Sequence, residues 1–136
     1  MAIRPDGEGN VTKTHVAWHE SKTIPRKAAY VPSPIAVDKW FFVVSDEGYL
    51  NCFEAKTGNR LWIEKLGNHH SGSPVYADGH LYLTSDEGIT YVVKAGPKFE
   101  VVAENPIGDQ CFSSPAISNG QIFLRGNRAI YCIGKK

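Results

Sequence analysis

Residues 33–62 read SPIAVDKWFFVVSDEGYLNCFEAKTGNRLW, and the tetrapeptide SDEG at residues 45–48 is written again at residues 85–88. The two copies are therefore separated by 40 residues. A second marker, the dipeptide Ser-Pro, recurs at nearly the same step, at residues 33–34, 73–74 and 114–115. A unit of about 40 residues in several copies is typical of repeat architectures, in which neighbouring units stack to bury a common core.

Each unit contains short β-rich runs separated by turn residues. The turns are Asp38-Lys39, Asp78-Gly79 and Asn119-Gly120. Asp-Gly and Asn-Gly between alternating apolar runs predict tight hairpins, because both central residues must take positive φ. We expect strands over 34–37, 40–44, 49–53 and 60–65, then over 74–77, 80–84, 89–93 and 100–103. The third copy supplies three strands and ends at Gly134.

Four-stranded antiparallel units of this length, arranged around an axis, are the blades of a β-propeller. We therefore predict an all-β chain of about three blades, forming an open arc or part of an oligomeric or longer ring. The single partial propeller domain, 1–136, divides into a first blade over 33–72, a second over 73–113 and a partial third over 114–136. Within segment 1–20, Thr14 to His19 is expected to close the third blade, in its own chain or in a neighbouring copy.

The composition is that of a folded chain, with 42% hydrophobic and 21% charged residues. A net charge of +1 gives no electrostatic reason to expect nucleic acid or an anionic membrane as a partner. No apolar run approaches the ~20 residues that a membrane span needs. The first residues lack the apolar stretch of a signal peptide, so we expect either a cytoplasmic chain or a leader further upstream.

Three cysteines without a Cys-x-x-Cys spacing do not predict a disulfide framework or a zinc site. Cys52 and Cys132 hold equivalent places in their units. Alternation along the strand puts both on one face, where we expect them to be small buried apolar side chains.

The repeated SDEG could bind a metal, but such a site needs further oxygen ligands converging on one ion. The third copy, Gly126-Asn127, has no acid at all. We therefore interpret SDEG as a turn in which Asp caps its own backbone and Gly takes positive φ. The loop with His69 and His70 is expected to reach the same rim and to be solvated, its two rings on opposite faces. The candidate rim residues are Asp46, Glu47, His69, His70, Asp86 and Glu87.

Residues 52–62, CFEAKTGNRLW, resemble the tryptophan-docking motif of the pyrroloquinoline-quinone-like propeller family. The resemblance implies a tight turn at Thr57-Gly58 and a Trp62 ring that lies against the neighbouring blade, its indole N–H bonded to backbone. Trp18 holds the matching place before the first unit, whereas the second unit has Val102 there. The family extends to proteins similar to the outer-membrane β-barrel assembly lipoprotein, which implies a periplasmic or extracytoplasmic parent.

The quinoprotein dehydrogenases of this family hold their quinone between a Trp floor and a vicinal cysteine pair, with calcium nearby. This sequence has no Cys-Cys pair, and we predict no catalytic, cofactor-binding or metal-binding residue. The favoured function is a non-catalytic scaffold for protein or peptide partners. The alternatives are a carboxy-terminal fragment of a quinone-dependent oxidoreductase-like propeller and a carbohydrate-binding propeller oligomer. Bare blade faces predict self-association, for example two copies forming a six-blade ring, or the missing part of a longer propeller.

Overall fold

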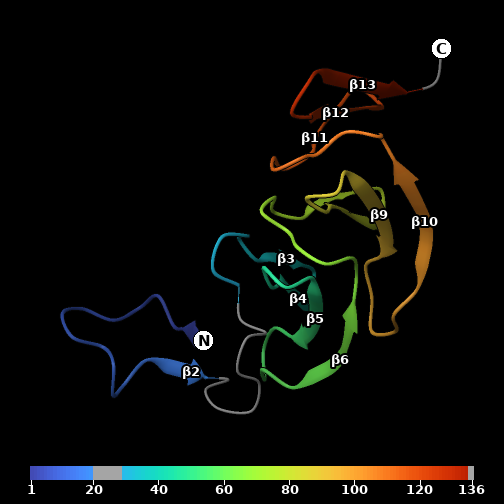
Figure 1. Cartoon of the computed structure of the whole chain (residues 1–136). Helices are drawn as coiled ribbons and strands as arrows, with labels where there is room; N and C mark the ends of the chain where they lie inside the picture. Colours follow the sequence, from blue (N-terminus) through green and yellow to red (C-terminus); the bar gives the residue numbers. More distant parts are fainter. Residues whose placement is uncertain (20–28, 135–136) are drawn as a thin grey trace.

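The computed structural model describes residues 1–19 and 29–134, and all regular elements in these ranges are β-strands. Three antiparallel sheets follow one another along an arc, and a two-stranded sheet lies at the opposite end from the C-terminus (Figure 1). The first sheet contains β3 (Ile35–Val37), β4 (Trp40–Val44), β5 (Tyr49–Glu54) and β6 (Arg60–Lys65). The second contains β7 (Val75–Ala77), β8 (His80–Thr84), β9 (Ile89–Lys94) and β10 (Val101–Pro106). The third contains β11 (Ala116–Ser118), β12 (Gln121–Arg125) and β13 (Ile130–Gly134).

The strand order within each sheet follows the chain, as expected for propeller blades. The first hairpin of each of the three blades turns through a residue with positive φ, at Asp38 (51°), Asp78 (45°) and Asn119 (50°). Short polar side chains tolerate this left-handed conformation better than bulky ones. The predicted strands match the observed ones within a residue or so, except that β10 runs on to Pro106.

The main core lies between the first and second sheets and belongs to neither alone. Each sheet contributes the apolar residues of one face, as strand alternation requires. The facing sets are Phe42, Val44, Leu50 and Cys52 on the first sheet and Leu81, Leu83, Tyr91 and Val93 on the second. Most of these side chains are completely buried, which is worth roughly 1.5–3 kcal/mol for each large one. The interface between blades is therefore what stabilises the blades.

The two equivalent cysteines have different environments. Cys52 is fully buried, and burial raises the pKa of its thiol to about 12. Cys132 is exposed, so the prediction that it is buried was wrong. The strand places Cys132 on the corresponding face, but among the described residues no further sheet covers that face of the third blade.

The amino-terminal strands also differ from the prediction. β2 (Val16–Trp18) pairs with β1 (Ala2–Ile3) and not with the third blade of its own chain. Trp18 lies opposite Ala2, and an irregularity follows before the next pair. Trp62 lies opposite Cys52 with an irregularity at the same point, so β1 and β2 repeat the register of β5 and β6. The segment thus reproduces the third and fourth strands of a blade that would precede the first one.

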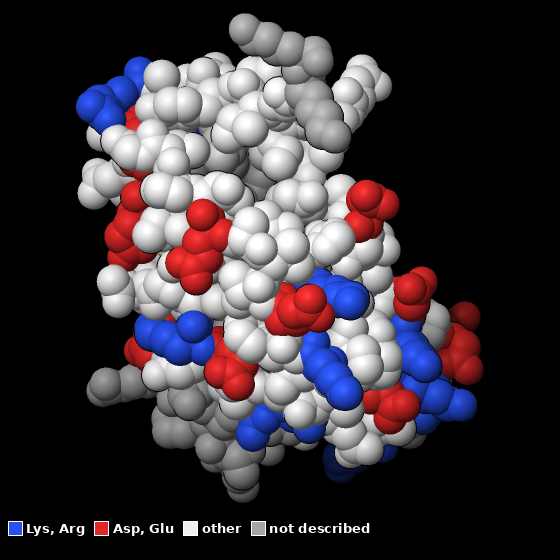
Figure 2. All heavy atoms as spheres, turned by 90° about the vertical axis from the view of Figure 1, so that its right-hand side faces the viewer, with Lys and Arg blue, Asp and Glu red and all other residues white. Residues whose placement is uncertain are grey.

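The amides two residues beyond Ala2 and two residues beyond Cys52 confirm this equivalence. Arg4 N donates to His15 O at 2.8 Å, and Glu54 N donates to Asn59 O at 2.9 Å. The outer strands β6 and β10 form the surface in Figure 2, where acidic and basic side chains are interspersed over the lower half of the face. Such mixed charge discourages other chains from pairing with an exposed strand.

Candidate functional site: the blade interfaces and the open edge

A ladder of serines joins the first strands of the three blades. Ser33 N donates to Ser73 Oγ at 2.9 Å, and Ser73 N donates to Ser114 Oγ at 2.8 Å. These are the serines of the three Ser-Pro pairs. The proline that follows each serine holds it in an extended conformation, which explains why the dipeptide recurs at every blade entry.

The SDEG corners bind the connections between blades. Asp46 accepts backbone N–H groups from Tyr30 (2.7 Å) and Val31 (3.0 Å), which lead into the first blade. Asp86 accepts the equivalent N–H from Ser71 (2.8 Å), together with the Ser71 hydroxyl (3.0 Å). The corner is a turn, as predicted, but these carboxylates do not cap their own backbone. They bind backbone N–H groups of the preceding connection, and we call this contact the clasp.

Local capping at the corner comes from the serine of SDEG. Ser45 Oγ accepts the N–H of Tyr49 at 3.1 Å, and Ser85 Oγ accepts that of Ile89 at 3.4 Å. Both serines are fully buried. The glycine of the tetrapeptide, Gly48, has φ of +78°, and a Cβ there would lie 2.6 Å from the backbone oxygen of Leu66. The corner therefore approaches the next connection too closely for a side chain.

The third blade keeps the clasp but reverses its direction. Its corner has no acid, and Asp109, in the connection leading to it, supplies the carboxylate. Asp109 accepts the N–H of Arg128 at 2.8 Å, the Arg128 Nε–H at 3.2 Å and the Tyr131 hydroxyl at 3.2 Å. The Arg128 backbone N–H is the main cause of the lowered pKa of Asp109. Asp109 was not identified in the sequence analysis. The signal that could have found it is an acidic residue in the connection before the third blade, whose own corner has none.

The two adjacent histidines point in opposite directions, as predicted, and have different environments. His69 is half-exposed, and its Nδ1 lies 2.6 Å from Asp86 Oδ2. His70 is fully buried, so its expected solvation was wrong. Its Nε2 hydrogen-bonds Leu66 O at 2.8 Å, while Nδ1 is buried without a hydrogen-bond partner. Burial lowers the pKa of His70 below its ordinary value.

Two tryptophans dock on the blade that follows them. Trp62 Nε1 donates to Gly96 O at 3.1 Å, and the ring contacts Phe99 edge-on at 5.3 Å between centroids. Trp18 Nε1 donates to Ala55 O at 2.8 Å, and the ring stacks on Phe53. The indole ring of tryptophan suits the contact between two blades, because it buries a large apolar area and its N–H can donate to a backbone carbonyl there.

The turn beneath Trp18 contains the other two residues of the motif. Gly58 has φ of +76° and lies directly against the Trp18 ring. Thr57 Oγ1 donates to Glu54 at 2.5 Å and accepts the N–H of Asn59 at 3.2 Å. This turn therefore forms the surface on which the preceding tryptophan packs.

No three His, Cys, Asp or Glu side chains of residues 1–19 and 29–134 come together as metal ligands. Nor does this part of the chain contain a helix with the length and hydropathy of a membrane span. The carboxylates of Asp46 and Asp86 accept hydrogen bonds from backbone N–H groups, and Glu47 and Glu87 are exposed residues.

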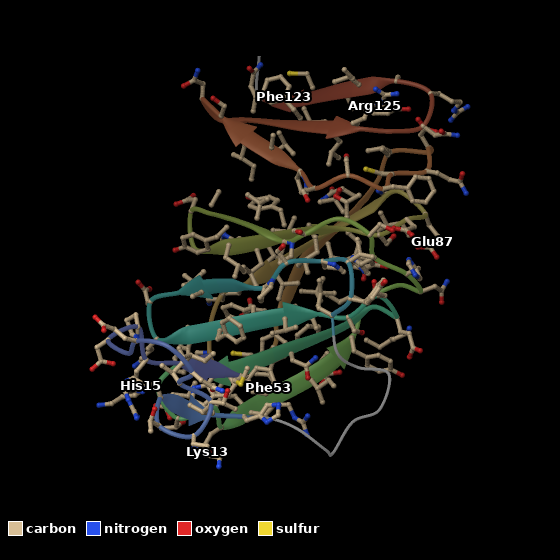
Figure 3. The ribbon with its side chains drawn as sticks, turned by 90° about the vertical axis from the view of Figure 1, so that its left-hand side faces the viewer. Lys13, His15, Phe53, Glu87, Phe123 and Arg125 are labelled. Carbon is tan, nitrogen blue, oxygen red and sulfur yellow. The ribbon has the colours of Figure 1, made fainter. Side chains whose placement is uncertain are left out.

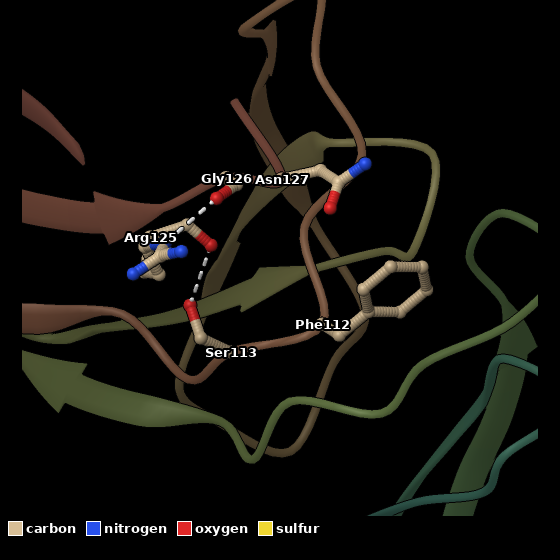
Figure 4. A pocket seen from close by; sticks show the side chains of 5 residues that line it. All are labelled: Phe112, Ser113, Arg125, Gly126 and Asn127. Atoms are coloured by element: carbon tan, nitrogen blue, oxygen red, sulfur yellow. Dashed lines mark hydrogen bonds between the residues drawn. The ribbon is translucent and has the colours of Figure 1, made fainter. Parts of the chain in front are cut away.

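A hollow of about 270 Å³ lies at the rim of the third blade, lined by Phe112, Ser113, Arg125, Gly126 and Asn127 (Figure 4). Its polar groups bind one another: Ser113 Oγ donates to Arg125 O at 3.1 Å, and Arg125 Nε donates to Gly126 O at 2.9 Å. These groups therefore serve the local structure and do not converge on a ligand.

Among the described residues, no sheet packs on one face of the third blade and no strand pairs with the outer edge of its last strand. Ile130 and Cys132 occupy the places of Leu50 and Cys52, yet Ile130 is 71% exposed while Leu50 is completely buried. Phe123 lies at the same end of the arc (Figure 3). β5 and β9 pair on both sides, whereas β13 pairs only with β12 among the described residues.

These sheets and their spacing define the class as a β-propeller, here a partial one of about three blades. The family described as outer membrane protein assembly factor BamB matches residues 11–96 and, in a second overlapping match, 46–133. The chain therefore belongs to this family.

A relative from Burkholderia pseudomallei (strain K96243), named outer membrane protein assembly factor BamB, is 28% identical over 104 residues. The match covers 76% of this chain and 26% of the relative, so the chain spans about a quarter of that protein.

Among solved structures, BamB from Moraxella catarrhalis is similar with a TM-score of 0.56 and 11% identity, over 74% of this chain and 41% of that one. A quinohemoprotein alcohol dehydrogenase from Comamonas testosteroni gives a TM-score of 0.61 with 15% identity, over 73% and 17%. A europium-containing methanol dehydrogenase gives 0.60 with 12% identity, over 74% and 22%. At these identities the likeness concerns the fold alone, because the same propeller supports different functions.

Proposed function

We propose that this chain is a non-catalytic protein-binding module that takes up an extended strand of a protein or peptide along the outer edge of β13. The observation that carries the proposal is the contrast between this edge and its two counterparts. A fourth strand covers β5 and another covers β9, but none among the described residues covers β13. In strand addition, main-chain hydrogen bonds supply affinity and alternate side chains supply specificity.

The backbone of β13 has a defined set of free groups. Gly126 N donates to Ala129 O, so Ala129 faces β12. Since backbone groups alternate in direction along an antiparallel strand, Ile130, Cys132 and Gly134 direct their N–H and C=O groups outward. A partner strand of about five residues can pair with them.

The amino-acid composition of β13 also supports the proposal that another strand pairs with its outer edge. β6 reads RLWIEK with three charged residues, and β10 carries Glu104 and ends at Pro106. Charge and proline are the usual protection of strands that stay at an edge. β13 reads IYCIG and has neither. Its composition is that of a strand with neighbours on both sides.

The name of the B. pseudomallei relative gives a class of partner. That protein is called an assembly factor for outer membrane proteins, and outer membrane proteins are built from β-strands. An edge that accepts extended strands suits partners of this kind. The proposed partner is therefore a protein segment in an extended conformation, with apolar residues on the face toward Phe123 and Ile130.

A strand peptide tests the proposal. The probe is a synthetic peptide of residues 59–66, which contains the chain's own fourth strand β6, and the control is the same peptide with alternate amides N-methylated. We expect the probe, and not the control, to slow hydrogen exchange at Ile130 and Cys132 and to raise the Tm. No change in β13 exchange at millimolar peptide would contradict strand addition. A rise in Tm with pyrroloquinoline quinone and calcium would contradict the non-catalytic assignment.

A further inference from the structure

We infer that β13 takes up β2 of a second copy of this chain, in place of that copy's β1, so that copies join head to tail. This inference rests on the proposed function, because it names the occupant of the edge described there. It comes from the two ends of the arc, which the internal repeat makes complementary.

The leading end already presents a fourth strand. Trp18 docks on the first blade as Trp62 docks on the second, through an indole hydrogen bond to a backbone carbonyl. β2 therefore lies where the outermost strand of a preceding blade belongs. Its partner β1 forms a ladder of only two residue pairs, whereas β5 and β6 form five. β1 corresponds to the third strand of a blade, and the described residues supply no first or second strand for that blade.

At the trailing end, the described residues form a third strand, β13, and no fourth strand of that blade. Cys132 and Ile133 are the third-blade equivalents of Cys52 and Phe53, which lie opposite Trp62 and Arg60. In the same register, Cys132 would lie opposite Trp18 of the second copy, where Ala2 lies within one chain. Ile133 would then replace Ile3 opposite Val16. The exchange keeps the register of the ladder and gives the second copy's β2 a longer partner strand.

The two ends of the serine ladder fit this arrangement. Ser33 donates to Ser73 and Ser73 to Ser114, each through its backbone N–H. Within the described residues, the ladder ends at the hydroxyl of Ser33 on one side and at the N–H of Ser114 on the other. If the third blade of one copy precedes the first blade of the next, the Ser114 N–H meets the Ser33 hydroxyl. The ladder then runs on from one copy to the other.

The docked copy would also cover the open face of the third blade. Phe123 and Ile130 on this face would meet the next copy's Trp18 and Phe41, which form an edge-on ring pair on its first blade. A contact between two different patches is heterologous, so repetition yields a closed ring or an open filament according to the angle between copies. Two copies would supply about six blades, within the usual range of ~4–8.

The test compares five proteins, the full chain and four variants, by sedimentation velocity under reducing conditions, over a hundredfold range of concentration. Deletion of residues 1–4 removes β1, the competitor for β2, and should tighten association at least tenfold relative to the full chain. Cys132→Pro removes an N–H that points outward and leaves the ladder to β12 intact, so it should abolish association. The same substitution in the deletion variant should return it to monomer, and Cys132→Ala should behave like the full chain.

The outcomes separate the two proposals. Monomers in all five proteins, or association that the deletion leaves unchanged, would overturn the inference while leaving peptide binding to β13 as an independent result. Association that persists in Cys132→Pro would show a contact elsewhere and would also overturn it. Circular dichroism of each variant identifies any that fails to fold. The Cys132→Ala protein then supplies the reference for the loss of the thiol alone.

Discussion

Replacement of Gly88 by alanine tests how closely the blades are docked. Gly88 ends the second SDEG corner with φ of +79°, and an added Cβ would overlap the backbone oxygen of Asp109 in the next connection. The same connection is bound there, because Ile107 N donates to Gly88 O at 3.0 Å. Gly79 is a matched control: its φ is +76°, and no atom lies within 4 Å of an added Cβ.

Both substitutions place alanine in the left-handed region, which costs about 1–2 kcal/mol. Only Gly88→Ala must also move backbone at a blade interface. Overpacking of this kind costs typically about 1–3 kcal/mol more. We therefore expect Gly88→Ala to lower the free energy of unfolding by roughly 2–5 kcal/mol and Gly79→Ala by only about 1–2 kcal/mol.

Urea unfolding followed by circular dichroism measures the difference, with the slope of the transition checked to be the same in both variants. Tryptophan fluorescence gives a second probe of the same transition. If both variants lose the same stability, the corner does not lie against the following connection, and the account of the SDEG glycine is wrong.

Three further predictions concern the clasp, the buried histidine and the thiols. Asp86→Ala removes three hydrogen bonds and should cost about 1–3 kcal/mol in urea unfolding, while the exposed control Glu47→Ala should cost under about 0.5 kcal/mol; equal losses would contradict the clasp. Because burial lowers the pKa of His70 in the folded chain, the unfolded chain binds a proton more readily, so stability should fall as the pH drops below 6.5. His70→Gln should flatten this fall, and an unchanged pH profile would exclude His70 as its cause. With a thiol reagent, Cys132 should react quickly and Cys52 only on unfolding, whereas rapid labelling of Cys52 would show that the main core is open.

The repeat predicted the fold because turn residues and alternation act locally. The step of 40 residues placed the hairpins, and Asp78-Gly79 in particular turns with positive φ at both residues. Period-2 alternation also predicted that Cys52 is buried. These inferences need only the backbone preferences of neighbouring residues, which a single sequence contains.

The interactions between blades were harder to predict, since they depend on which segments meet. The carboxylate of Asp46 binds backbone N–H groups that lie 15 and 16 residues earlier in the chain. Because every residue except proline has a backbone N–H, residue identity does not indicate which ones a carboxylate will bind. Asp109 was missed for the same reason. The burial of Cys132 was predicted wrongly because alternation gives the face of a strand and not whether another sheet covers it. The alternative in which Val16–Trp18 closes the third blade of its own chain was wrong, because Ala2–Ile3, too short to show a pattern, was not recognised as its partner.

Residue-resolved hydrogen exchange, at a concentration where sedimentation shows a monomer, distinguishes an unpaired β13 edge from a paired one. The account predicts slow exchange of the Leu50 and Cys52 amides, which bond to β6, and fast exchange of the equivalent Ile130 and Cys132 amides. Equal, slow exchange at both pairs would mean that β13 already has a fourth strand and that the open edge does not exist.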